Sequence, residues 1–203
     1  KVVPVSINDI ADFEEKIKLY NQGNYKTAGF MHEIVLMNYG GIRLTEEFLQ
    51  KAYALCEEYD TPTMVDEIQS CMWYDGMFQF RLYDLKPDFV IIGKGFPGGE
   101  YPASKVITTA ESDNLNQFGA LVTNGQEELA SLAYLITMTF ALANREKIAE
   151  IGDYFEARLN ELCAKYPEKL TQIEGAGLLA ALHCKDIDSA KAFMNALHDA
   201  CID

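Results

Sequence analysis

One lysine in this sequence stands between an apolar run and a group of glycines. Residues 89–92, FVII, have the composition of a fully buried strand, and Lys94 follows in the stretch GKGFPGG. Positions 93, 95, 98 and 99 are all glycine, so few side chains surround the amine. A lysine amine that few side chains surround could bond to the carbonyl carbon of a ligand. We therefore interpret Lys94 as a candidate catalytic residue.

A second polar group follows another short apolar run. Asp66 and Glu67 end the stretch TPTMVDE, and Gln69 comes three residues after Asp66. Ligands of open α/β sheets bind beyond the carboxyl ends of the strands. If neighbouring parallel strands carry Asp66 and Lys94, a carboxylate and an amine face one crevice. Such a pair suits pyridoxal phosphate (PLP), since the amine forms the Schiff base and the carboxylate keeps the pyridine nitrogen protonated.

The elements that must position these residues alternate along the first 110 residues. Apolar runs and helix-capping residues predict strand, helix, strand, helix, and then three more strands, which is typical of an α/β fold with a mainly parallel sheet. The predicted strands are 2–6, 28–37, 61–67, 89–92 and 105–109, and the predicted helices are about 8–20 and 45–59. We expect Asn8 or Asp9 to cap the first helix and Thr45 to cap the second.

The character of the chain changes near residue 125. Two long helical patterns, about 127–146 and 147–165, precede a strand pair within 172–184 and one more helix over 187–201. We expect 1–125 to be the second half of a ligand-binding large domain, 126–150 a connecting helix, and 151–203 the start of a small α+β domain.

Composition excludes several classes of function. A net charge of −14 without a basic stripe argues against a nucleic-acid partner. Five scattered cysteines and three histidines form neither a disulfide framework nor a zinc site, so we expect no metal and a reducing, cytoplasmic location. The longest apolar run, 129–143, is too short to span a bilayer.

The motifs around the candidate residues resemble those of class III, fold-type I aminotransferases. The runs MVDEIQS and KPDFVIIGKGFPGGEYP are similar to the family's D-E-V-Q-T-G and K-P-D…G-K-G-L-G-G-G-x-P. EIVLMNYG, TNGQEELA and IEGAGLLAAL resemble three further family motifs in the same order. The resemblance covers essentially the whole chain.

This resemblance implies a PLP-dependent aminotransferase that moves an amino group between an amine or amino acid and a keto acid or aldehyde. Lys94 would carry the cofactor as a Schiff base and shuttle the proton. Asp66 would pair with the pyridinium nitrogen, and Gln69 would bond the cofactor's phenolic oxygen. Thr123 would reach the phosphate across the interface of a homodimer, and Glu33 would lie near the substrate. Trp73, Phe78 and Phe80 are expected to pack rather than stack on the cofactor, and the three histidines to be structural.

The sequence also departs from the family pattern. The family arginine in the loop after the D-E-V-Q motif is replaced by Tyr74, inside a crowded apolar segment. The family's earlier phosphate-binding segment and late substrate arginine have no counterpart here. We expect a fragment that lacks the N-terminal part and the C-terminal end of the family, and that is inactive alone.

Three alternatives stay open at this stage. A 2,1-aminomutase of the glutamate-semialdehyde type would use the same lysine, and a non-catalytic aminotransferase-like scaffold would use none of this chemistry. A nucleotide hydrolase fits less well, because its phosphate loop needs G-x-x-x-x-G-K-[ST] and Lys94 is followed by Gly95 and Phe96.

Overall fold

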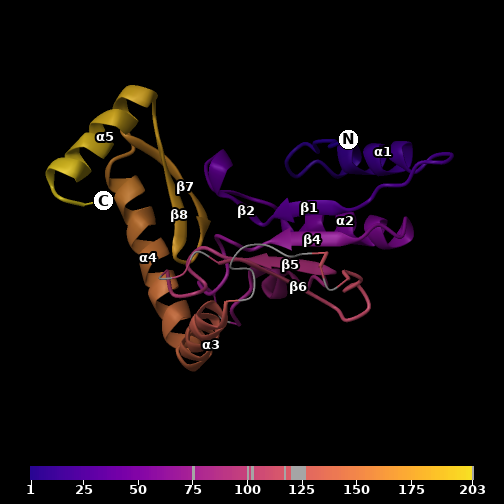
Figure 1. Ribbon diagram of the computed structural model, residues 1–203. Helices are drawn as coiled ribbons and strands as arrows, with labels where there is room; N and C mark the ends of the chain where they lie inside the picture. The colour runs from indigo at the N-terminus through magenta and orange to yellow at the C-terminus, as the bar shows by residue number, and fades with distance from the viewer. Residues whose placement is uncertain (75, 100, 102, 117, 120–126, 203) are drawn as a thin grey trace.

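The structure is a computed structural model, which describes residues 1–74, 76–99, 101, 103–116, 118–119 and 127–202. Its main sheet has the strand order β1-β4-β5-β6 (Figure 1). Strands β1 (Phe30–Glu33), β4 (Thr63–Asp66) and β5 (Phe89–Ile92) are parallel, and β6 (Lys105–Thr108) pairs antiparallel with β5. The prediction of an α/β fold with a mainly parallel sheet is confirmed.

Two capped helices pack against each other beside the sheet. Helix α1 (Ile10–Tyr20) begins after Asp9, whose carboxylate accepts a hydrogen bond from the backbone N–H of Asp12. Helix α2 (Glu46–Glu58) begins after Thr45, whose hydroxyl accepts a hydrogen bond from the N–H of Phe48. Because a side-chain oxygen satisfies an N–H that the helix leaves free, both starts could be predicted from the sequence.

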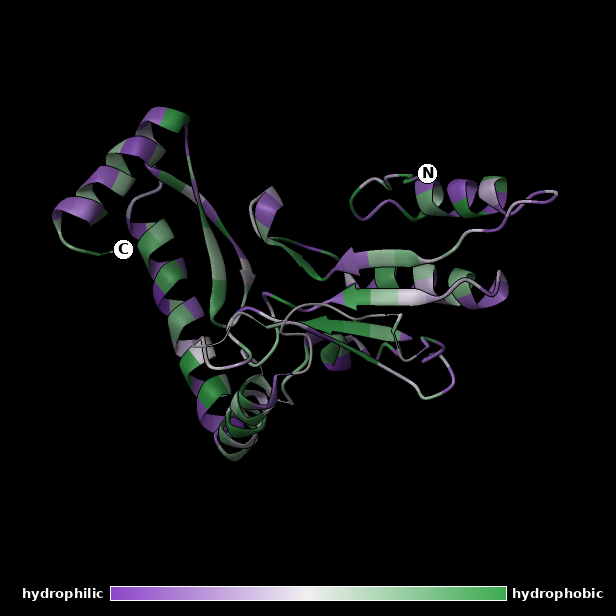
Figure 2. Ribbon diagram, in the orientation of Figure 1, coloured by the Kyte–Doolittle hydropathy of each residue, from purple (hydrophilic) through white to green (hydrophobic). Residues whose placement is uncertain are grey.

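The core lies between these helices and one face of the sheet. Leu49 of α2 and Val65 of β4 are fully buried, and α1 contributes Phe13 and Ile17 to the same cluster. Strand β5 is hydrophobic along its length (Figure 2), which is typical of strands in parallel sheets whose two faces are both covered.

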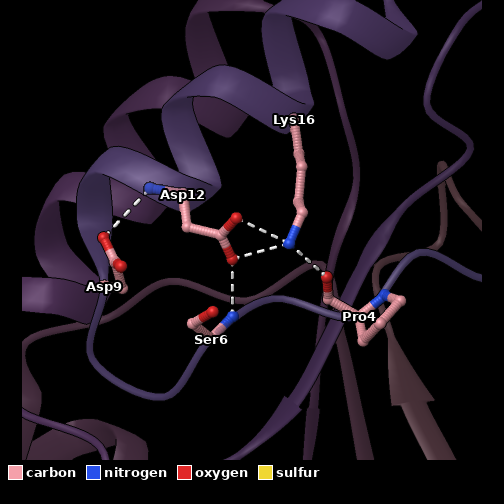
Figure 3. A network of polar contacts seen from close by, with 5 residues as sticks. All are labelled: Pro4, Ser6, Asp9, Asp12 and Lys16. Atoms are coloured by element: carbon pink, nitrogen blue, oxygen red, sulfur yellow. Dashed lines mark hydrogen bonds and ion pairs between the residues drawn. The ribbon is translucent and has the colours of Figure 1, made fainter.

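The segment 2–6, predicted as a strand, forms no strand in the structure. Its backbone is held instead by side chains of α1: the N–H of Ser6 donates to Asp12 Oδ2 at 2.7 Å, and Lys16 Nζ donates to the carbonyl oxygen of Pro4 at 2.7 Å (Figure 3). Lys16 also pairs with Asp12. Pro4 has no N–H to give to a neighbouring strand, which disfavours sheet pairing.

The predicted strand over 28–37 is interrupted. Strand β1 ends at Glu33, and after the fully buried Ile34 the short strand β2 (Val35–Leu36) pairs antiparallel with β3 (Ile42–Arg43) in a separate sheet. The 3₁₀ turn η1 (Met37–Tyr39) joins β2 to β3. A largely apolar segment does not by itself reveal where a chain changes from one sheet to another.

The remaining elements follow the predicted order. Helices α3 (Glu128–Ala143) and α4 (Arg145–Lys165) lead to an antiparallel pair, β7 (Leu170–Ala176) and β8 (Leu179–Cys184), and to helix α5 (Ile187–Asp199). The β7–β8 pair lies along α4, beside the carboxyl edge of the main sheet (Figure 1). The division into a large and a small domain stays a prediction.

None of the helices within the described ranges has both the length and the apolar character needed to cross a membrane.

Candidate functional site

The carboxyl ends of three parallel strands meet at one edge of the main sheet. Glu33 lies opposite Asp66 in the β1–β4 register, and Asp66 lies opposite Ile91 in the β4–β5 register. Partners in register point to the same face of a sheet, so Glu33 and Asp66 share a face. Lys94 follows β5 by two residues. The structure therefore brings Asp66 and Lys94 to adjacent strand ends, as the sequence predicts.

The two carboxylates at this edge differ in their surroundings. Asp66 is half-buried, and its Oδ1 accepts a hydrogen bond of 2.9 Å from the N–H of Ile68, which turns the chain out of β4. Burial raises the pKa of Glu33, the Asp66 carboxylate raises it further, and the Lys94 ammonium lowers it. These three charges therefore influence one another.

Glu67 has a structural role that its position next to Asp66 does not reveal. Its side chain is fully buried; Oε2 accepts a hydrogen bond of 2.6 Å from the Ser70 hydroxyl, and Oε1 accepts one of 2.7 Å from the N–H of Phe80. Burial raises its pKa. Through these bonds Glu67 fixes both ends of the loop between β4 and the 3₁₀ helix η2 (Gln79–Tyr83). A serine three residues after the acid was the only sequence signal for this arrangement.

Lys94 adopts a backbone conformation that lysine rarely adopts. Its φ is +48°, in the left-handed region, and its side chain is exposed. A non-glycine residue in this region costs about 1–2 kcal/mol, and such residues cluster at functional sites. The N–H of Phe96 donates to the carbonyl of Gly93 at 3.0 Å, which closes a tight turn around the lysine. The turn directs Lys94 away from the path of β5.

The glycines around Lys94 do not all serve to clear space for a ligand. A Cβ on Gly93 would lie 3.3 Å from Ser104 Cβ and 3.7 Å from Ile68 Cγ1, so neighbouring residues of the fold already fill that space. At Gly95 the nearest atom would be Met72 Cε at 3.8 Å, an ordinary contact. The glycine at 93 is thus explained by packing.

A cavity of about 190 Å³ lies beside Lys94. Two predicted cofactor residues, Gln69 and Lys94, line it, whereas Asp66 and Glu33 lie outside its lining. The other lining residues are mostly apolar: Ile68, Cys71, Met72, Trp73, Gly95, Phe96 and Leu179. Leu179 comes from β8, so the β7–β8 pair contributes to the wall. Thr123, the predicted phosphate ligand, and Pro102 lie outside the described residues.

The aromatic residues near the site divide into two groups. Phe78 stacks on Phe80 with 5.6 Å between ring centroids, and Phe78 also stacks on Phe96 at 6.2 Å. These rings pack, as predicted. Trp73 is 38% exposed and lines the cavity, and its predicted packing role stays a prediction.

The histidines are placed apart from Lys94's cavity. Buried His32 lies 3.0 Å from the Tyr53 hydroxyl, and desolvation lowers its pKa to about 4. His183 Nε2 lies 2.6 Å from the carbonyl oxygen of Gly40, and His198 lies near the end of α5. In the described part of the chain, no group of three or more His, Cys, Asp or Glu residues is arranged to hold a metal ion.

Comparison with known proteins identifies relatives over nearly the whole chain. The model of the family described as aminotransferase class-III matches residues 4–202. The mitochondrial ornithine aminotransferase of Arabidopsis thaliana is 28% identical over 86% of this chain and 38% of its own length. The acetylornithine aminotransferase of Methanocaldococcus jannaschii is 31% identical over 86% of this chain and 43% of its own length. The putrescine aminotransferase of Pectobacterium atrosepticum is 27% identical over 95% of this chain and 42% of its own length.

Solved structures give the same result for the fold. An ornithine aminotransferase from Toxoplasma gondii, described as having partial occupancy of PLP at its active site, matches with a TM-score of 0.78 and 26% identity. The match covers 93% of this chain and 45% of that one. The ornithine aminotransferase of Plasmodium yoelii matches with a TM-score of 0.76 and 25% identity. This match covers 89% of this chain and 47% of that one. The chain thus spans less than half of the length of these relatives.

Proposed function

The chain belongs to the class-III aminotransferase family, and we propose that it is the lysine-bearing part of a PLP-dependent transaminase. The observation that carries this proposal is the placement of Asp66 and Lys94 at the carboxyl ends of neighbouring parallel strands, with Lys94 and Gln69 on one cavity. The substrates would be an amino donor and a keto acid or aldehyde acceptor.

The residues present fit the cofactor. PLP offers an aldehyde carbon, a pyridine nitrogen, a phenolic oxygen and a phosphate, and the site offers an amine, a carboxylate and a carboxamide. The cavity of about 190 Å³ is smaller than the roughly 300–1,000 Å³ of complete small-molecule sites. We propose that further walls of the site are supplied by residues other than those that line the cavity here.

Each group would have a separate task. Lys94 Nζ would bond to the cofactor's aldehyde carbon and, once a substrate amine has displaced it, would carry a proton between two carbon atoms. The Asp66 carboxylate would pair with the pyridine nitrogen and keep it protonated. Gln69 would donate to the phenolic oxygen, and Thr123 would hold the phosphate. When bound, PLP supplies an electron sink for the pair left by a broken bond at the substrate carbon.

Glu33 is proposed as a substrate-side residue. It shares a face with Asp66 and is influenced by the Lys94 charge, so it lies at the edge of the sheet where a substrate would approach. A carboxylate there would favour a cationic group on the substrate.

The assembly and location are also proposals. Family resemblance supports a homodimer in which Thr123 acts at the neighbouring subunit's cofactor. A cytoplasmic location remains a prediction, because one relative is described as mitochondrial.

Amino transfer by the longest product of the gene tests the proposal. The assay would pair a panel of amines and amino acids with 2-oxoglutarate and would compare the wild type with Lys94→Ala and with Lys86→Ala, a control at an exposed lysine. We expect Lys94→Ala to lose at least about 10²-fold in rate, as when a catalytic base is removed, and Lys86→Ala to retain activity. Equal activity of all three proteins would contradict the proposal.

A further inference from the structure

The loop that lines the cavity is hydrogen-bonded to the β7–β8 pair. The Tyr74 hydroxyl donates a hydrogen bond of 3.0 Å to the carbonyl oxygen of Ala176, at the end of β7. Tyr74 is buried, with 7% of the residue exposed. Burial raises the pKa of the phenol, so Tyr74 remains a neutral donor at physiological pH.

The turn between β7 and β8 lies directly against the same loop. Gly177, with φ of +57°, approaches so closely that a Cβ there would lie 3.3 Å from the Trp73 carbonyl oxygen and 3.4 Å from Tyr74 Cε1. The loop and the turn therefore touch without room for a side chain between them.

This contact lies between two walls of the cavity. Trp73 precedes Tyr74, Leu179 follows Gly177 by two residues, and both side chains line the cavity together with Lys94. A displacement of the turn relative to the loop would change the distance between these walls.

The apolar packing at this junction is small. Val35, Tyr74 and Ala176 form a buried cluster of their own, with Met37 and Leu179 packed against it. A second hydrogen bond reaches the neighbouring residue of β7: Arg43 Nε donates to the Gly175 carbonyl oxygen at 3.2 Å. Because so few apolar groups hold the junction, each hydrogen bond has a large share in its geometry.

We propose that Tyr74 is a positioning residue whose hydrogen bond to Ala176 holds the β7–β8 turn in place and so sets Leu179 as a wall of the Lys94 cavity. The part of this inference that concerns the ligand rests on the proposed function, in which PLP occupies the cavity. Tyr74 itself touches neither the cofactor nor the substrate in this account.

Tyr74→Phe tests the inference, because it removes the hydroxyl and keeps the ring. Tyr134→Phe is a matched control: Tyr134 is also buried, and its hydroxyl also donates to a backbone carbonyl, that of Ala103, at 3.0 Å. Trp73 is the only tryptophan of the chain, so its emission reports on the cavity wall. Gly177→Ala, which places a methyl group 3.3 Å from the Trp73 carbonyl oxygen, is a second variant should Tyr74→Phe fold poorly.

Two readings are taken on each protein: quenching of Trp73 emission by acrylamide, and the Kd for PLP from quenching of the same emission. We expect Tyr74→Phe to make Trp73 more accessible and to weaken PLP binding by about fivefold, which corresponds to one ordinary hydrogen bond. Tyr134→Phe should lose a similar amount of stability and leave both readings unchanged.

The outcomes separate the inference from the proposed function. If the wild-type 203-residue chain binds no PLP, the proposed function is decided by PLP binding to the longest product of the gene. Acrylamide quenching alone then decides the inference: greater accessibility of Trp73 in Tyr74→Phe supports it, and unchanged accessibility overturns it. If PLP binds, an unchanged Kd in Tyr74→Phe, or an equal loss in both variants, overturns the positioning role.

Discussion

Glu33 lies directly opposite Asp66 on the neighbouring parallel strand, so two carboxylates share one face of the sheet at its carboxyl edge. The Lys94 ammonium opposes the effect of Asp66 on the Glu33 pKa. This relationship between charges on three different strand ends can be tested without any cofactor.

Removal of each neighbouring charge should shift the Glu33 pKa in opposite directions. Asp66→Asn removes a like charge and should lower the pKa, whereas Lys94→Ala removes an opposite charge and should raise it. Carbon-detected NMR titration of the Glu33 carboxyl measures both shifts. Asp60→Asn, at an exposed acid paired with Lys26, is the control and should leave Glu33 unchanged. Two shifts of the same sign would contradict the arrangement.

The Glu33 carboxyl group also contributes to the pH dependence of the protein's stability. The folded pKa of Glu33 lies above its ordinary value of 4.5, so the folded protein retains a proton that the unfolded chain releases. This contribution to stability is therefore lost as pH rises from 4.5 through the folded pKa. In Glu33→Gln that part of the pH dependence should disappear from urea unfolding curves.

The left-handed backbone of Lys94 predicts an unusual order of stability. Glycine adopts φ of +48° without strain, so Lys94→Gly should be more stable than Lys94→Ala by about 1 kcal/mol. Urea unfolding of the 203-residue chain measures the difference. At Lys86, which lacks a positive φ, the order should reverse, because glycine has more conformational freedom to lose on folding. The same order at both positions would contradict the strained geometry.

Buried His32 predicts a loss of stability in mild acid. Its folded pKa of about 4 lies below the ordinary 6.5, so the unfolded chain binds a proton that the folded protein excludes. The contribution of neutral His32 to stability therefore falls as the pH drops from 6.5 toward 4. We expect this titration to lower the free energy of unfolding by about 2 kcal/mol between pH 7 and pH 5. His32→Gln should remove this part of the dependence of the unfolding free energy on pH. An unchanged slope would show that His32 titrates normally.

Local signals in the sequence were sufficient for much of the fold. The caps at Asp9 and Thr45 and the apolar run of β5 depend on neighbours within a few residues, so they could be predicted. The failed strand at 2–6 depended on side chains of α1 that take its backbone groups. Whether an extended segment joins a sheet is decided by its tertiary partners.

The site shows the same division between local and distant contacts. The apolar runs before Asp66 and Lys94 predicted that these two residues would follow neighbouring parallel strands. The left-handed turn at Lys94 and the bond from Tyr74 to Ala176, 102 residues away in the chain, could not be predicted, because each depends on contacts made only after folding.

The central claim is that Lys94 bonds covalently to PLP. The most direct measurement is to incubate the longest product of the gene with PLP, reduce it with borohydride, and map the modified peptide by mass spectrometry, beside Lys94→Ala and this 203-residue chain. The account predicts a cofactor mass on the peptide that contains Lys94, and no such mass in the variant. Its absence from the 203-residue chain alone would mean that the site needs further residues. A modified lysine elsewhere, or none in the longest product, would contradict the account.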